Sequence, residues 1–466
     1  MAARAAARHA APPPAAEPEV PLRRIVAFFA LVFGMFMAIL DIQIVSSSLS
    51  EIQAGLSASQ DEISWVQTSY LIAEVVMIPL SGFLSRGLST RVLFTLSAAG
   101  FTLSSVLCAT ATSIEEMILY RALQGFIGGA MIPTAFAASY IIFPPKARGG
   151  VMALVGLTVT LAPTIGPTVG GYLTELFSWH WLFLVNIVPG MAATLIAWTL
   201  VDFDEPDPAL LRKFDWLGLA AMAIFLGSVE YVLEEGQKDD WFESGEIRLL
   251  TLSAVVGGLI FFWRVFRSDT PIVDMQAYRN RNFAVGSLMT FVLGVGLYGL
   301  TYLYPLYLAR VHHYSALQIG ETVFVTGAAM FFTAPVVGVL TRKFDPRRII
   351  LVGLIGFAAS CAMLTPITKD WEFDELLAPQ VLRGIALMFC MVPINLLALG
   401  TLSPLEVKNA SGLFNLTRNL GGAVGLALIN TEIQARSDLH FSRLADHVAW
   451  GAGEAEARLA MMARAF

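Results

Sequence analysis

Long apolar runs separated by short polar stretches recur along almost the whole chain. Each run has about 20 residues, the length that an α-helix needs to cross about 30 Å of hydrocarbon. The pattern predicts thirteen transmembrane helices. Their predicted limits are 25–47, 63–83, 92–112, 115–142, 150–174, 181–201, 216–234, 247–266, 283–309, 318–341, 349–368, 376–400 and 410–430. The predicted fold class is therefore an all-α integral membrane protein.

Composition supports the same class. Of 466 residues, 56% are hydrophobic and only 14% are charged, whereas soluble domains have about 25% charged residues. A soluble protein of this size could not cover its surface with so few charges. The net charge of −6 argues against a nucleic-acid binder, which needs a basic face. The three cysteines lie in apolar runs, so neither a disulfide framework nor a zinc site is expected.

Lysine and arginine are concentrated in alternate loops, nineteen on one side against four on the other before the C-terminal tail. Cytoplasmic loops carry the excess of basic residues, so the rich side is predicted to be cytoplasmic. The opposite loops are acidic, for example at Glu234 and Glu235. Residues 1–21 are rich in Ala, Pro and Arg and are predicted to be a disordered cytoplasmic N-terminus. The first apolar run is too long for a signal peptide, and we expect it to remain as a span.

The sequence contains an internal repeat at a constant offset of 256 residues. Five identities carry it: Pro79 and Pro335, Gly82 and Gly338, Leu84 and Leu340, Arg86 and Arg342, and Arg91 and Arg347. We expect two pseudo-symmetric six-helix bundles in parallel orientation, with an inserted helix pair between them. The predicted division is 22–201 for the first bundle, 202–270 for the linker with its two helices, and 271–435 for the second bundle. Two such halves suit alternating-access transport about a central site.

The repeat also predicts a gap. The sixth span should recur at about 437–457, but that stretch is too charged to cross a bilayer. The second bundle is therefore expected to have five spans, with the final span absent from this chain. Residues 436–466 are predicted to be a polar tail outside the cytoplasm.

Four segments resemble signatures of one family. They are Leu40-Asp41-Ile42-Gln43-Ile44-Val45 in the first span, the loop Gly82–Arg91, Arg121-Ala122-Leu123-Gln124-Gly125 in the fourth span, and Gly156–Gly171 in the fifth. Together they are similar to the fourteen-span drug:proton antiporters of the major facilitator superfamily, the EmrB/QacA-like branch. Two positions depart from the family pattern: Ser85 stands where an acidic residue is usual, and Gln43 where threonine is typical.

The resemblance implies a proton-driven antiporter that exports multiple hydrophobic or amphipathic compounds from a bacterial inner membrane. It also implies a periplasmic membrane fusion adaptor and an outer-membrane channel as partners, with protons as the coupling ion and no other cofactor. A dedicated exporter of one metabolite or siderophore, or a non-transporting receptor or scaffold on the same fold, are the alternatives. An enzyme is not expected, because no nucleotide loop, metal-ligand spacing or catalytic constellation occurs.

Three charged residues inside spans are the candidates for proton coupling: Asp41, Glu74 and Arg121. Each costs at least about 2.5–3.5 kcal/mol in a bilayer, so each needs an explanation. Asp41 and Arg121 lie at similar depth, which predicts an ion pair or a shared water site. The alternatives are a helix-packing bond for either acid and a structural clamp for Arg121. Leu297 and Met330 replace the two acids in the repeat, so coupling is predicted in the first half and requires water to reach the acids from alternate sides.

Further candidates come from polar, aromatic and helix-bending residues in the spans. Either close packing that seals the inner leaflet between the halves and blocks leak, or ordinary membrane-helix packing, is expected from Gly156, Pro163, Gly166, Pro167, Gly170 and Gly171. The candidates for a cargo cavity are Gln43, Gln124, Tyr298, Tyr302, Asn415 and Arg418. By the resemblance, a cytoplasmic loop gate is expected at Gly82, Arg86, Arg91, Gly338, Arg342 and Arg347. Arg383, near the outer end of its span, is expected to extend its charged group to the membrane surface.

Overall fold

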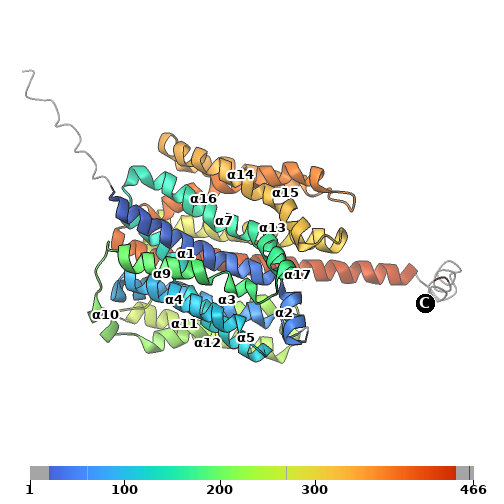
Figure 1. The fold of residues 1–466 in the computed structure, drawn as a ribbon, viewed down its shortest axis with the longest axis horizontal. Helices are drawn as coiled ribbons and strands as arrows, with labels where there is room; N and C mark the ends of the chain where they lie inside the picture. Colours follow the sequence, from blue (N-terminus) through green and yellow to red (C-terminus); the bar gives the residue numbers. More distant parts are fainter. Residues whose placement is uncertain (1–19, 60, 269, 448–460, 462–466) are drawn as a thin grey trace, which may run out of the picture.

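The computed structural model describes residues 20–59, 61–268, 270–447 and 461, and within these ranges the regular structure is entirely helical. Figure 1 shows most of the helices running side by side along the long axis of the molecule. The helices of the first half are α1 (Leu22–Ser46), α2 (Leu49–Leu56), α3 (Trp65–Leu88), α4 (Thr90–Ala109), α5 (Ile114–Gly128), α6 (Met131–Ile142), α7 (Pro145–Leu176), α8 (Trp181–Leu184) and α9 (Ile187–Leu200).

The rest of the described chain contains the linker, the inserted pair and the second half. Its helices are α10 (Pro208–Arg212), α11 (Trp216–Glu235), η3 (Trp241–Glu243), α12 (Gly245–Arg267), η4 (Met275–Arg279), α13 (Arg281–Val311), α14 (Ala316–Lys343), α15 (Pro346–Met363), α16 (Phe373–Leu399) and α17 (Pro404–His447). Twelve stretches of the described residues are helical, long and apolar enough to cross a membrane, and each coincides with a predicted span.

The thirteenth predicted span, 410–430, lies in α17 and is not among those twelve. Asn415, Arg418 and Asn419 lower its hydropathy, yet the segment is helical and largely buried. It packs along α13 and α3. Polar side chains that other helices cover therefore explain why this segment is less apolar than the other spans.

The repeat is visible in the helix boundaries. Helix α4 begins at Thr90 and α15 at Pro346, which are 256 residues apart. The two halves meet along two seams, where α7 packs on α14 and α3 packs on α17. Figure 1 shows α7 between α1 of its own half and α14 of the other half.

The inserted pair α11 and α12 covers one of these seams. The two helices pack on each other, and α11 also packs on α3 and on α17. The Thr68 hydroxyl of α3 donates to Glu235 of α11 at 2.9 Å. Trp241, just after α11, donates its ring N–H to Thr431 of α17 at 3.1 Å. The inserted pair therefore contacts both halves at the place where they meet.

Helix α17 continues past the bundle. Figure 1 shows it projecting on the side where α2 lies, and Gln434–Ala445 are exposed. The first part of the predicted polar tail, 436–447, thus extends α17 as a helix. The remainder of that tail, apart from residue 461, lies outside the described residues, as do residues 1–19 of the predicted disordered N-terminus.

Candidate functional site

A cavity of about 410 Å³ lies between the two halves. Its walls come from α1, α3, α6 and α7 of the first half, from α13, α14 and α17 of the second half, and from α11 of the inserted pair. The polar side chains that line it include Gln43, Gln67, Glu74, Glu230, Glu234, Tyr298, Thr301, Tyr302, Arg418 and Asn419. Most of the remaining wall is aliphatic, so the cavity suits an apolar molecule that carries a few polar groups.

The cavity reaches one end of the molecule. Its lining includes Ser46 at the end of α1, Glu234 near the end of α11, and Ile319 near the start of α14. The opposite end is where α3 gives way to α4 and α14 to α15, and we call it the basic end because the loops rich in Lys and Arg lie there. The cavity therefore lies toward the end away from the basic end.

Contacts between the halves close the basic end. Tyr140 of α6 donates its hydroxyl to the Asn395 carbonyl of α16 at 2.7 Å. Ser411 of α17 donates to the Pro133 carbonyl of α6 at 3.0 Å. Beside them the Lys408 ammonium of α17 pairs with Asp204 of the linker. These bonds join elements more than 200 residues apart in sequence, so they hold the two halves together at this end.

Glu74 and Arg418 face the cavity from opposite halves. Glu74 is on α3 and Arg418 is on α17; they are 3% and 2% exposed, and both line the cavity. The Glu74 Oε1 and the Arg418 Nε and Nη1 atoms have no hydrogen-bond partner within the described chain. The Arg418 guanidinium lies 5.7 Å from the centre of the Phe136 ring. The cavity thus contains one acid and one base whose polar atoms are only partly satisfied.

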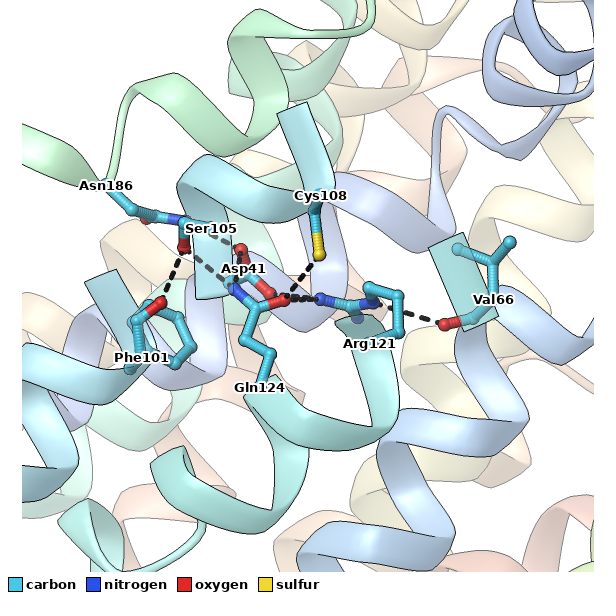
Figure 2. A network of polar contacts seen from close by, with 8 residues as sticks. All are labelled: Asp41, Val66, Phe101, Ser105, Cys108, Arg121, Gln124 and Asn186. Atoms are coloured by element: carbon cyan, nitrogen blue, oxygen red, sulfur yellow. Dashed lines mark hydrogen bonds and ion pairs between the residues drawn. The ribbon is translucent and has the colours of Figure 1, made fainter. Parts of the chain in front are cut away.

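Asp41 and Arg121 form a separate cluster, which Figure 2 shows. Arg121 Nη1 lies 2.7 Å from Asp41 Oδ2, and neither side chain has any exposed surface. Asp41 Oδ1 accepts from Asn186 at 2.7 Å and from Gln124 at 3.3 Å. Arg121 also donates to the Val66 carbonyl at 3.1 Å. All these groups belong to the first half, so the ion pair predicted from equal depth forms within one bundle.

This placement separates the three coupling candidates. Glu74 lines the cavity, whereas Asp41 and Arg121 do not. Both oxygens of Asp41 are already occupied by donors from neighbouring helices. The expectation that water reaches Asp41 is therefore not met in this conformation. Of the three coupling candidates, Glu74 is the one that lines the cavity.

The six cargo candidates divide four to two. Gln43, Tyr298, Tyr302 and Arg418 line the cavity, but Gln124 and Asn415 do not. Gln124 lies one helical turn from Arg121, and its amide nitrogen donates hydrogen bonds to Asp41 and Ser105. Asn415 is fully buried on α17, one turn closer to the basic end than Arg418, and it donates to the Ser411 carbonyl. The sequence does not distinguish these two residues from the other four, because helical spacing sets the face of a side chain but not what lies opposite it.

Gly166 and Gly170 of the fifth span pack against the first half, whereas Gly156 faces α16 of the second half. A side-chain carbon at Gly166 would collide with Gln43 of α1, and one at Gly170 would meet Ser47 of α1 at 2.8 Å. A carbon at Gly156 would have ordinary room. Pro163 and Pro167 line the cavity. Gly166 and Gly170 therefore hold α7 against α1, which agrees with the alternative of ordinary membrane-helix packing for these two positions.

The predicted gate residues lie at or near the basic end. A side-chain carbon at Gly82 would lie 2.7 Å from the backbone of Asn409 on α17, and one at Gly338 would lie 3.2 Å from the backbone of Gly150 on α7. Both glycines thus permit close contact between the halves. Arg86 bonds the Gly82 carbonyl, Arg91 lies 5.4 Å from the Trp198 ring, and Arg342 and Arg347 are exposed. Nothing in this geometry assigns a gating role to the four arginines.

Arg383 departs from its prediction. It is 2% exposed, it donates to the Thr301 hydroxyl at 2.9 Å, and its guanidinium lies 5.5 Å from the Tyr304 ring. The expectation that this side chain reaches the membrane surface is wrong, because α13 covers it.

Three functional residues were missed by sequence reasoning. Glu230 lies inside an otherwise apolar predicted span, which by itself marks it for attention. Asp204 accepts from the Thr90 backbone at 2.8 Å and pairs with Lys408, so the linker places an acid at the basic end near Ser85. Asn186 bonds Asp41 from the turn between α8 and α9. No sequence signal separates Asp204 or Asn186 from ordinary loop residues.

Comparisons with known proteins agree with this architecture. The family model of the Major Facilitator Superfamily matches residues 31–426. The chain is 45% identical over 419 residues to the colistin resistance protein EmrB of Acinetobacter baumannii, covering 90% of this chain and 81% of that protein. It is 30% identical to the multidrug export protein EmrB of Escherichia coli K12, covering 91% of this chain and 83% of that protein. The human organic anion transporter MFSD10 matches in fold, with a TM-score of 0.62 at 17% identity over 89% of this chain and 94% of that chain.

Proposed function

Because the chain belongs to the major facilitator superfamily, we propose that it exports several hydrophobic or amphipathic compounds in exchange for protons. The names of its relatives, multidrug export and colistin resistance proteins, support efflux of harmful compounds. The observation that carries the proposal is a cavity between two halves that is closed at the basic end. Such an arrangement is one of the two states that alternating access requires.

The orientation follows from the charge distribution. The protein is a multi-pass membrane protein, and its basic loops favour a cytoplasmic basic end in a bacterial inner membrane. The cavity then faces the outside, and the contacts of Lys408, Tyr140 and Ser411 form the cytoplasmic closure. Opening of these contacts, with closure at the other end, would expose the same cavity to the cytoplasm.

Glu74 is the proton carrier in this proposal. An isolated carboxylate in a low-dielectric wall is costly, so its charge must be offset by a proton or by a nearby cation. Arg418 stands in the opposite half, so a movement between the halves changes the surroundings of Glu74. One proton moving inward provides about 2.3 kcal/mol per 100 mV of membrane potential. That free energy is available to move cargo outward.

Asp41 and Arg121 contribute indirectly in this proposal. Their ion pair joins α1 and α5, and its partners Asn186 and Val66 bring in the turn before α9 and helix α3. The cluster fixes the position of α3, which carries Glu74. A direct part in proton transfer would require the first bundle itself to open.

The partners of the exporter are also part of the proposal. The resemblance to EmrB-like permeases suggests a periplasmic membrane fusion adaptor and an outer-membrane channel. The acidic loops at the cavity end and the exposed part of α17, Gln434–Ala445, provide a surface on which an adaptor could bind.

Reconstitution tests the proposed function. The full-length protein in proteoliposomes should export a lipophilic dye when a pH gradient is imposed, and the rate should fall to the passive level when the gradient is dissipated. Efflux that does not depend on the gradient would refute proton coupling. The absence of any protein-dependent efflux would favour a receptor or scaffold, and export of a single compound class would favour a dedicated exporter.

A further inference from the structure

The inserted helix α11 forms part of the cavity wall. Glu230 and Glu234 lie one turn apart near its end, and both line the cavity together with residues of the two halves. Helix α11 packs on α3 on one side and on α17 on the other. It therefore places acidic groups at the seam where the halves meet.

Glu230 is buried without a matching cation. Its side chain is 6% exposed, and its Oε2 atom has no hydrogen-bond partner among the described residues. Glu234 and Glu74 are the charged side chains with the largest electrostatic effect on it, and both are acidic. Glu74 differs, because Arg418 and Arg121 act on it from other helices. Of these two acids in the cavity wall, Glu230 is thus the one without a compensating positive charge among the described residues.

Helix α11 is held firmly at the cavity end. The Lys238 ammonium lies 3.6 Å from Glu235 and 3.7 Å from Asp61, which ties the helix end to the segment before α3. Thr68 and Thr431 add hydrogen bonds from α3 and α17. These contacts satisfy Glu235 and leave Glu230 facing the cavity. A loosely attached peripheral helix would not be fixed to both halves in this way.

We propose that Glu230 binds the positively charged group of cationic amphiphilic cargo, so that the inserted helix supplies the charge-recognition site of the cavity. This inference rests on the proposed function and specifies the cargo class. An ammonium or similar cation provides the opposite charge that the buried carboxylate lacks. The apolar body of the cargo then contacts the aliphatic wall, and Tyr298 and Tyr302 offer ring faces to the cation or to flat groups.

Equilibrium binding tests this assignment without any transport. The purified full-length protein in detergent is titrated with ethidium, a cationic dye, and with Nile red, a neutral dye. Glu230→Gln keeps the size of the side chain and removes its charge, so it should weaken ethidium binding at least tenfold and leave Nile red binding within twofold. Glu230→Asp should recover part of the ethidium affinity. Glu243→Gln, an exposed acid just beyond α11, is the control and should change neither.

The outcomes separate the inference from the proposed function. Unchanged ethidium binding by Glu230→Gln overturns the inference, as does an equal loss for both dyes, which indicates a change of cavity shape. Absence of ethidium binding to the unaltered protein also overturns it. Gradient-driven efflux of a neutral dye by Glu230→Gln, measured after the same purified protein is reconstituted into proteoliposomes, reports on the exporter function independently.

Discussion

Two of the buried groups of charges differ in how they are satisfied. Asp41 and Arg121 share a 2.7 Å ion pair inside one half, and both Asp41 oxygens accept hydrogen bonds. Glu74 and Arg418 line a cavity between the halves, and each has polar atoms without a hydrogen-bond partner among the described residues, whereas in the first group only Nη2 of Arg121 lacks one. Similar burial thus has opposite consequences. Paired charges fix the helices around them, whereas unpaired charges in a cavity are available to protons and ligands.

The largest effect on stability is expected from breaking the ion pair between Asp41 and Arg121. Arg121→Met leaves the Asp41 carboxylate buried without its cation, which should lower the free energy of unfolding by about 3–5 kcal/mol. Arg418→Met removes a cation that has no ion pair within the described residues, so it should lower the free energy of unfolding by less than Arg121→Met does. Denaturant-induced unfolding in detergent micelles measures both variants. Equal losses would contradict the distinction between the two groups.

An intermediate effect is expected at the basic end. Lys408→Met removes the contact with Asp204, and a loss of about 1.4 kcal/mol corresponds to a tenfold shift in the open population. Ser411→Cys places a thiol at a fully buried position between the halves. Its alkylation by a thiol reagent should be roughly tenfold faster when Lys408→Met is added. The protein without Ser411→Cys gives the background from its own cysteines, and an unchanged rate would show that Lys408 does not close this end.

The smallest effect is expected from an exposed ion pair whose N–O distance equals that of Asp41 and Arg121. Arg436 and Glu432 on the projecting part of α17 also lie 2.7 Å apart, but their side chains are 68% and 64% exposed. Glu432→Gln should change the free energy of unfolding by no more than about 0.5 kcal/mol, because water already solvates both groups. The same unfolding assay measures it. A loss comparable to that of Arg121→Met would mean that distance rather than burial sets the strength of these pairs.

The sequence predicts the architecture well because spans and repeats are properties of local composition. Apolar runs locate twelve spanning helices, and the offset between Arg86 and Arg342 aligns the two halves. Equal depth along two helices also predicts the pairing of Asp41 with Arg121. Each of these predictions needs only the rise of a helix and the thickness of a bilayer.

The cavity is harder to predict because it depends on which helix faces lie opposite each other. Gln124 and Arg418 look alike as polar residues in spans, yet one bonds Asp41 and the other faces the cavity. The sequence marks Glu230 as an acid inside an apolar span, but it does not show that α11 lies over the seam between α3 and α17, which is what places Glu230 and Glu234 in the cavity wall. The role of Asp204 likewise cannot be predicted from the sequence, because it depends on the linker folding back to bring this acid to Lys408.

The most direct test of the central claim compares two transport modes in Glu74→Gln. The glutamine cannot carry a proton, so the account predicts that efflux driven by a pH gradient is lost. Exchange of labelled for unlabelled dye, which needs no net proton movement, should continue at a rate near that of the unaltered protein. Gradient-driven efflux that persists in Glu74→Gln would contradict the assignment of the coupling proton to the cavity acid.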